Sequence, residues 1–200
     1  MLTSDQNRKI NEIVEEFKEA ADFYRMEYSE DLMGMFRDFG CMLLLKCKVD
    51  TEGKADLERL LEGRHKLKGT VKRQLMTVSE ELAQLWAPGE QDGSGDTGEY
   101  EGSQNVREMF QTALEEIFYF CLYSKGGKNR YLLPEETAKP LLRLLTFPEG
   151  MMAGNEGLMV LDTQCGAGSA LMAASRYLKN PRLMGYEKDE EMWAAAVIMS

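Results

Sequence analysis

The chain has 200 residues, with 24 Lys and Arg against 34 Asp and Glu, which gives a formal net charge of −10 at pH 7. Apolar residues make up 44% and charged residues 29% of the sequence, values that are ordinary for soluble globular proteins and exclude wholesale disorder. The length allows one large domain or two small ones. An acidic chain repels the phosphate backbone, so any contact with nucleic acid must use a local basic patch.

The cysteines and the single histidine exclude several kinds of site. His65 is the one histidine, so His-rich metal sites are excluded and we expect no bound metal. The start of the sequence is polar, and its longest aliphatic stretch, residues 41–45, is far too short to span a membrane. We therefore expect neither a signal peptide nor a membrane segment, and a cytoplasmic protein. Reduced thiols agree with this location, because the cysteines form no CxxC pair and no zinc-type spacing: Cys41, Cys47, Cys121 and Cys165.

Residues 1–87 carry helical periodicity and are expected to form an N-terminal helical domain. The first helix presents apolar side chains at helical spacing between Ile10 and Tyr28, with Ser4 or Asp5 as its N-cap. A second helix is expected over residues 30–48, where large apolar residues recur at the same spacing.

A third, long helix is expected over residues 55–86, with Gly63 and Gly69 as interruptions. Its apolar residues alternate at steps of four and three, which suits either a coiled coil or packing within a helical bundle. The seam is short, which favours the bundle: Val71, Leu75, Val78, Leu82 and Leu85.

The composition changes sharply at residues 88–103, which read PGEQDGSGDTGEYEGS. This stretch is rich in glycine and acidic residues and has no apolar cluster, so it is expected to be an acidic linker and the domain boundary. Residues 104–200 then form the predicted C-terminal domain, which opens with amphipathic and Pro-initiated helices. Its last elements are a buried strand at 158–161, a glycine turn at 163–169, a helix at 170–178, a strand at 182–186 and a helix at 189–199.

This order predicts one right-handed βαβ unit with a ligand site at the ends of its strands. Gly166 and Gly168 allow a sharp turn that approaches a ligand closely, and Glu187 at the tip of the second strand can accept both hydroxyls of a ribose. Asp162 can receive an amine or orient the glycine turn. A third glycine at GxGxxG spacing is missing, since Leu171 stands there, which favours a nucleoside without a phosphate.

Residues 160–171, VLDTQCGAGSAL, resemble the S-adenosylmethionine loop of class I methyltransferases, most closely that of adenine-specific DNA methyltransferases of restriction-modification systems. Residues 185–189 are similar to the second family motif, and residues 131–134 to the segment that packs over the methionine part of the cofactor. The resemblance implies an α/β fold with a mainly α-helical N-terminal part and a partial Rossmann-like βαβ unit with a small parallel sheet. It also implies S-adenosylmethionine as the cofactor.

The resemblance implies a role for each residue of the site. Gly166 and Gly168 would line the cofactor, with Cys165 beside them in the D-x-x-C-G-x-G turn. Asp162 would face the methionine amine and Glu187 the ribose. Pro134 would belong to the segment over the methionine part of the cofactor.

Several departures from the family pattern bear on catalysis. Leu133 replaces a Thr and Thr163 replaces a Pro, and the Asn/Asp-Pro-Pro-aromatic motif is absent from the sequence. We therefore expect a C-terminally truncated or split enzyme that lacks autonomous catalysis and needs a protein partner or a second half. No catalytic residue is assigned. The alternative is a non-catalytic interaction protein of a mobile element or phage, which inhibits a nucleic-acid-binding defence enzyme in an anti-restriction or anti-CRISPR role.

A local basic stretch stands out in the acidic N-terminal domain. It is either a solvated helix face or a contact for phosphate or an acidic partner, and it is where nucleic acid would bind. The stretch consists of Arg64, Lys66, Lys68, Lys72 and Arg73.

Overall fold

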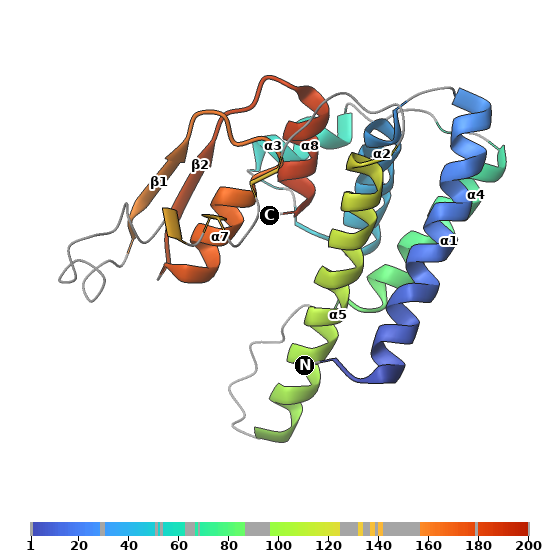
Figure 1. Cartoon of the computed structure of the whole chain (residues 1–200), viewed down its shortest axis with the longest axis horizontal. Helices are drawn as coiled ribbons and strands as arrows, with labels where there is room; N and C mark the ends of the chain where they lie inside the picture. The colour runs from blue at the N-terminus through green and yellow to red at the C-terminus, as the bar shows by residue number, and fades with distance from the viewer. Residues whose placement is uncertain are drawn as a thin grey trace. The chain divides into compact units, whose positions relative to one another are not determined.

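The computed structural model divides into two compact units, Met1–Lys128 and Asn129–Ser200. The residues that it describes are 2–28, 31–50, 52, 54–62, 67, 69–86, 97–124, 132–133, 137–138, 140–141, 157–178 and 180–199. Within these ranges the chain forms seven helices and one parallel sheet of two strands, so the mainly helical α/β composition is confirmed (Figure 1). None of the described helices is long and apolar enough to cross a membrane.

The first helix, α1 (Ser4–Tyr28), begins at a capping box. The Thr3 hydroxyl accepts a hydrogen bond from the Gln6 N–H at 3.3 Å, and the Gln6 side chain accepts one from the Thr3 N–H at 2.7 Å. Thr3 is therefore the cap, and the prediction of Ser4 or Asp5 was wrong. The predicted apolar face is buried in the core through Ile10, Ile13, Val14, Phe17, Ala20, Ala21 and Tyr24.

The second helix, α2 (Leu32–Lys46), lies within the predicted range of 30–48 and is the most buried helix of the first unit. Its N-cap is Asp31, whose carboxylate accepts a hydrogen bond from the Met33 N–H at 2.8 Å. The helix packs against α1, α4 (Gly69–Ala83) and α5 (Thr97–Leu122). This central position explains why its side chains are buried on nearly all sides.

The helix predicted over 55–86 is interrupted and forms two helices, α3 (Ala55–Glu62) and α4 (Gly69–Ala83), which confirms the predicted interruption at Gly69. Gly69 has a φ of +64°, a conformation that glycine adopts without the steric cost that a Cβ would add, and α4 starts there. Gly63 lies outside the described residues. The predicted seam is confirmed as core. Helix α4 packs against α1 and α2 and buries Val71, Leu75, Val78 and Leu82, and Leu85, just beyond its end, is buried as well.

Helix α5 (Thr97–Leu122) closes the first unit. The sequence analysis placed residues 88–103 in a linker and residues 104–200 in the second domain, whereas the helix already begins at Thr97 and packs on α1 and α2. Phe118 lies 5.3 Å from Phe36 of α2, measured between ring centres. The observed division therefore falls after α5, because the partners of its apolar face are the N-terminal helices.

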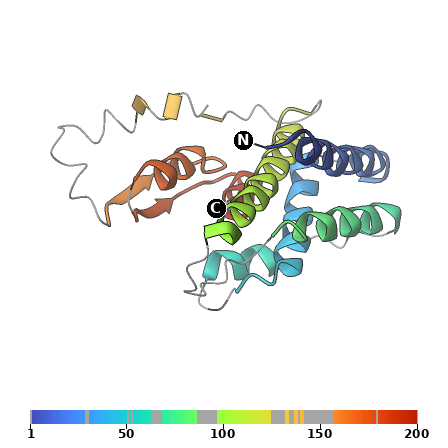
Figure 2. The same ribbon diagram turned by 90° about the horizontal axis from the view of Figure 1, so that it is seen from below.

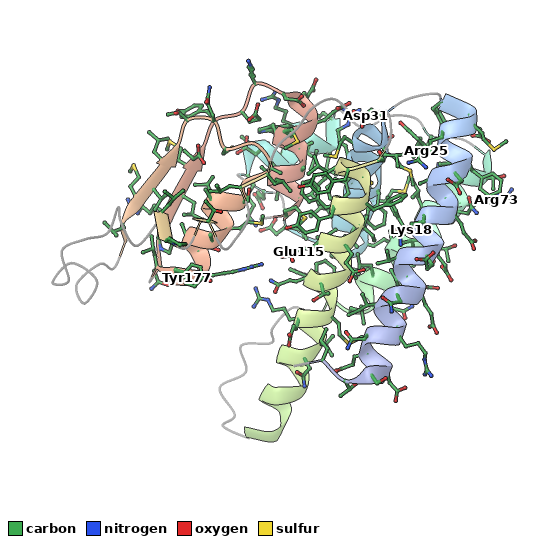
Figure 3. All side chains as sticks on the ribbon, in the orientation of Figure 1. Lys18, Arg25, Asp31, Arg73, Glu115 and Tyr177 are labelled. Carbon is green, nitrogen blue, oxygen red and sulfur yellow. The ribbon has the colours of Figure 1, made fainter. Side chains whose placement is uncertain are left out.

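Cations cover an aromatic ring of α5. The ammonium of Lys18 and the guanidinium of Arg25, both on α1, each lie 5.8 Å from the ring centre of Phe120 (Figure 3). Both cations also pair with acids one turn earlier on the same helix, Glu15 and Asp22 respectively. These contacts join α1 to α5 at the edge of the core.

The second unit is a strand–helix–strand–helix series. Strand β1 (Met159–Asp162) pairs in parallel with β2 (Arg182–Gly185), and the helix between them, α7 (Ser169–Tyr177), packs along both strands (Figure 2). Helix α8 (Glu190–Met199) follows. The register places Asp162 opposite Gly185, so the two strands end side by side. The predicted parallel pair is confirmed.

One expectation about the first strand is wrong. The apolar run was predicted to be buried on both faces, but Met159 is 63% exposed and Leu161 is 53% exposed. Val160 points to the other face, where it packs with Ala173 and Ala174 of α7. The reason is that, among the described residues, helix α7 covers one face of the sheet and no element covers the other.

Candidate functional site

A tight glycine turn leads from β1 into α7. Gly166 has a φ of +56° and Gly168 a φ of +81°, both in the left-handed region that favours glycine. The Gly168 N–H donates to the Cys165 carbonyl at 2.8 Å, which closes the turn immediately before the first residue of the helix. The two predicted glycines therefore have a conformational role in the turn.

Glu187 holds this turn in place through hydrogen bonds to backbone N–H groups. Its carboxylate accepts a hydrogen bond from the Gly166 N–H at 2.9 Å and another from the Asp189 N–H at 2.8 Å, one on each oxygen. A carboxylate has about four lone-pair directions, so each oxygen keeps one for a further donor. The acid that was predicted from the strand end thus meets the predicted glycine, although they are far apart in the sequence.

Backbone hydrogen bonds extend the pairing beyond the end of β2. The Tyr186 N–H donates to the Asp162 carbonyl at 2.9 Å, and the Tyr186 carbonyl accepts from the Cys165 N–H at 3.0 Å. Tyr186 is therefore held through both of its backbone groups. This arrangement fixes the glycine turn against the segment that carries Glu187.

Gly185 is a site residue to which the sequence analysis gave no role of its own, although it placed Gly185 in the second strand and in the motif at 185–189. A Cβ added there would lie 2.8 Å from Cys165 Sγ and 2.8 Å from Leu171 Cδ1, closer than real Cβ contacts come. The two strand ends can lie side by side at the turn only because this position has no side chain. The sequence feature that could have indicated this role is a glycine directly before an aromatic residue and an acid.

Asp162 performs one of its two predicted roles in the structure. Its Oδ1 accepts a hydrogen bond from the Gln164 N–H at 3.0 Å, so the carboxylate orients the start of the turn. The side chain is half-buried at the end of β1. The bond to Gln164 uses one lone pair and leaves the others for a ligand.

Cys165 is buried within the turn, and its environment works against a nucleophilic role. Burial raises the pKa of the thiol, and the negative charges of Asp162 and Glu187 raise it further. The backbone N–H of Cys165 opposes this shift to a smaller extent. A thiol with a raised pKa holds little thiolate at neutral pH, so we assign Cys165 a packing role beside Gly185.

Gly168 faces protein atoms on the side where a Cβ would lie. That Cβ would lie 3.4 Å from the Cβ of Ala196 on α8, and Gly168 itself is buried. The missing side chain at Gly168 therefore serves the close packing of the turn on α8. A Cβ on Gly166, which is half-buried, would meet its nearest atom at 3.7 Å, the Met192 Cε.

A cavity of about 490 Å³ opens beside the ends of the two strands. Its volume falls within the range of small-molecule sites. The described residues that line it follow β1 and β2: Thr163, Gln164, Tyr186, Glu187 and Lys188. Glu187 alone among these was predicted as a ligand contact.

The remaining predicted contacts are only partly described. Pro134, Arg64, Lys66 and Lys68 lie outside the described residues, as does most of the helix expected to open at Pro134. Lys72 and Arg73 are exposed on α4, and Figure 3 shows Arg73 on the outside of the first unit. In the described part of the chain, no three His, Cys, Asp or Glu side chains are placed to hold a metal ion.

Comparison with known proteins gave no match: no family model fits the chain, and neither a curated protein nor a solved structure is significantly similar to it. The functional assignment therefore depends on the geometry at the strand ends.

Proposed function

We propose that the second unit binds S-adenosylmethionine in the cavity at the ends of β1 and β2. The observation that carries the proposal is the hydrogen bond from the Gly166 N–H to Glu187, at 2.9 Å, beside that cavity. It brings a glycine turn and a ribose-type carboxylate together at neighbouring strand ends, where open parallel sheets bind ligands.

The chemistry of Glu187, which lines the cavity, and of Asp162, the last residue of β1, fits this cofactor. Glu187 has a free lone pair on each oxygen for the two ribose hydroxyls, and the Asp162 carboxylate suits the positively charged amine of the methionine part. When bound, the cofactor supplies a methyl group on a sulfonium.

Only binding is proposed for this chain. Methyl transfer requires an acceptor that is held in line with the sulfonium, and the resemblance to adenine-specific DNA methyltransferases would assign that task to an Asn/Asp-Pro-Pro-aromatic motif. The sequence contains no such motif. The groups that hold an acceptor would lie outside the residues of this sequence.

Calorimetric titration of the full chain with S-adenosylhomocysteine, the demethylated cofactor product, tests the ribose contact. We expect the 2′-deoxy analogue to bind about 10-fold or more weakly, because a hydrogen bond to a charged carboxylate is lost. This comparison leaves the protein unchanged, so it is independent of the role of Glu187 in the turn. Equal affinities for the two compounds, or no binding of either one, would contradict the proposal.

The Asp162→Asn variant tests the amine contact. Asparagine keeps an oxygen that can accept the Gln164 N–H but removes the negative charge. We expect S-adenosylmethionine to bind about 10-fold more weakly to this variant and adenosine, which has no amino-acid part, to bind equally well. Equal loss for both ligands would mean that Asp162 acts only on the turn.

The open sheet face favours a second candidate function, which is docking to another macromolecule. Met159, Leu161 and Met184 are exposed on one face, with Leu161 directly opposite Met184 in the register. Parallel sheets are ordinarily covered on both faces, so we propose that a partner, either the second half of a methyltransferase or a defence nuclease, covers this one.

Nuclease assays distinguish the two kinds of partner. If the chain is an anti-restriction or anti-CRISPR protein, purified protein inhibits a restriction or CRISPR nuclease at near-stoichiometric amounts, and Leu161→Lys removes the inhibition. Gln111→Lys, an exposed change on α5, serves as the charge-matched control. Cofactor binding without any inhibition would reject this candidate.

A further inference from the structure

The side chain of Tyr186 has a feature that the proposed function does not use. Tyr186 is one of the residues that line the cavity and is 61% exposed, although its backbone is held on both sides by hydrogen bonds to Asp162 and Cys165. Other exposed tyrosines of the described chain are already engaged: Tyr123 stacks on Tyr119 with ring centres 6.3 Å apart. No aromatic or cationic contact involves Tyr186 within the described residues.

Such a ring is suited to stacking. A tyrosine has only two side-chain torsions, and the pinned backbone removes most other freedom, so little entropy remains to be lost when a flat ligand binds. Every nucleobase offers a π-face of the required kind. Glu187, the next residue, lines the same cavity and offers its lone pairs to a ribose.

We propose that Tyr186 is the stacking platform for the base of the bound nucleoside. The inference rests on the proposed function and deepens it: the cavity takes ligands in which an aromatic base and a ribose are joined, with the ribose at Glu187 and the base on the ring of Tyr186. Purines, which have the larger π-face, bind more tightly than pyrimidines. The phenol oxygen of Tyr186 plays no part in this contact.

The test uses the full chain with two ligands, S-adenosylhomocysteine in calorimetry and the fluorescent adenosine analogue 2-aminopurine riboside. Stacking on a tyrosine quenches 2-aminopurine, which gives a signal that a purely structural role would not produce. Tyr186→Phe keeps the ring and Tyr186→Ala removes it. Tyr123→Ala removes a comparably exposed ring from α5 and serves as the matched control.

We expect the wild type, Tyr186→Phe and Tyr123→Ala to have the same affinity as one another for each ligand. All three should quench the fluorescence of 2-aminopurine riboside. Tyr186→Ala should bind about 5- to 100-fold more weakly, as for removal of other base-stacking side chains, and should not quench. Loss in both Tyr186 variants would assign the contact to the phenol oxygen and overturn the stacking proposal.

The outcomes separate this inference from the proposed function. If S-adenosylhomocysteine binds in a manner that depends on its 2′-hydroxyl but not on the Tyr186 ring, the stacking inference is wrong and the proposed function stands. If 2-aminopurine riboside binds and is quenched by Tyr186 while S-adenosylhomocysteine does not bind, stacking is supported and the proposed cofactor is wrong. If neither ligand binds, both are rejected.

Discussion

At the scale of single residues, the second unit centres on a carboxylate that holds the glycine turn and to which we assign ribose binding as a second task. Glu187 accepts backbone hydrogen bonds from Gly166 and Asp189, so it holds the glycine turn and the approach to α8 in place. Its remaining lone pairs are those we assign to the ribose. A variant at Glu187 therefore tests folding and binding together, which is why the tests above change the ligand or Asp162.

Gly185→Ala is expected to destabilise the second unit by about 1–3 kcal/mol, because the new Cβ would overlap Cys165 Sγ and Leu171 Cδ1. Denaturant unfolding followed by the fluorescence of Trp193, in a Trp86→Phe background, reports on this unit alone. Gly157→Ala is the control: its φ is +83° but no atom lies within 4 Å of the added Cβ, so it carries backbone strain without overlap. Stability of Gly185→Ala equal to that of the wild type would contradict the overlap argument.

Cys165 should react slowly with iodoacetamide at pH 8, several-fold more slowly than in the unfolded chain. Burial raises the pKa of this thiol above the ordinary cysteine value of 9.0, and the negative charges of Asp162 and Glu187 raise it further. Less thiolate is therefore present at pH 8 than in the unfolded chain. The rate should rise as the pH passes above 9, where the thiol ionises. Mass spectrometry of the labelled peptide measures it.

Asp162→Asn provides the matched comparison for Cys165. Because the variant removes one of the negative charges that raise the thiol pKa, we expect faster labelling than in the wild type at pH 8. An unchanged rate in Asp162→Asn, or wild-type labelling as fast as in the unfolded chain, would mean that the electrostatic account of this thiol is wrong.

Sequence reasoning reached some site residues and missed others for a physical reason. Gly166 and Glu187 are recognisable because a glycine turn and an acid at a strand end have local signatures. Gly185 matters through its distance from Leu171, and Tyr186 through the cavity that it lines. Both depend on how the two strands are registered, which the sequence pattern does not specify.

At the scale of elements, helix ends were harder to predict than helix faces. The buried faces of α1, α4 and α5 follow directly from apolar periodicity, since burial of one face is what the spacing encodes. The start of α1 depends on a reciprocal pair of hydrogen bonds between Thr3 and Gln6, a T-x-x-Q pattern that was present in the sequence but overlooked. The break before α4 depends on the left-handed conformation of Gly69.

Asp31→Ala should destabilise the first unit by about 1 kcal/mol, because the Met33 N–H at the start of α2 loses its partner. Asp31→Asn keeps an oxygen acceptor and should cost much less. Unfolding in denaturant, followed by Trp86 fluorescence in a Trp193→Phe background, measures both. Equal stability of Asp31→Ala and the wild type would show that the cap contributes nothing to this helix.

The partners of an element were less predictable than the element itself. Helix α5 was expected from its amphipathic pattern, but the acidic, glycine-rich stretch before it suggested a domain boundary. The helix in fact contacts α1 and α2, and the division falls after it. Periodicity tells which face of a helix is buried, whereas the choice of neighbour depends on shape and packing across the whole unit.

At the scale of the whole molecule, the net charge of −10 governs how the chain meets other macromolecules. Lys72 and Arg73, which are exposed on α4, are the described residues of the basic stretch in a strongly acidic sequence. We therefore expect no measurable binding to random duplex DNA at 150 mM salt in a mobility-shift assay.

The salt dependence supplies the internal check for this prediction. Any weak binding at low salt should depend on Lys72 and Arg73 and should vanish in Lys72→Glu/Arg73→Glu, while Lys9→Glu on α1 should leave it unchanged. Binding at 150 mM salt that survives the double substitution would show that the basic stretch is not the contact.

The structural task of Glu187, together with the ribose contact that we propose for it, has an evolutionary consequence. Selection for folding alone would retain this carboxylate and Gly166, because the turn depends on their hydrogen bond whether or not a ligand is present. A lineage that lost the cofactor would therefore keep both. The Tyr186 ring is under no such constraint, since its backbone alone holds the strand ends together. Among descendants of this chain, the loss of an aromatic residue at this position would be the earliest mark of a lost ligand.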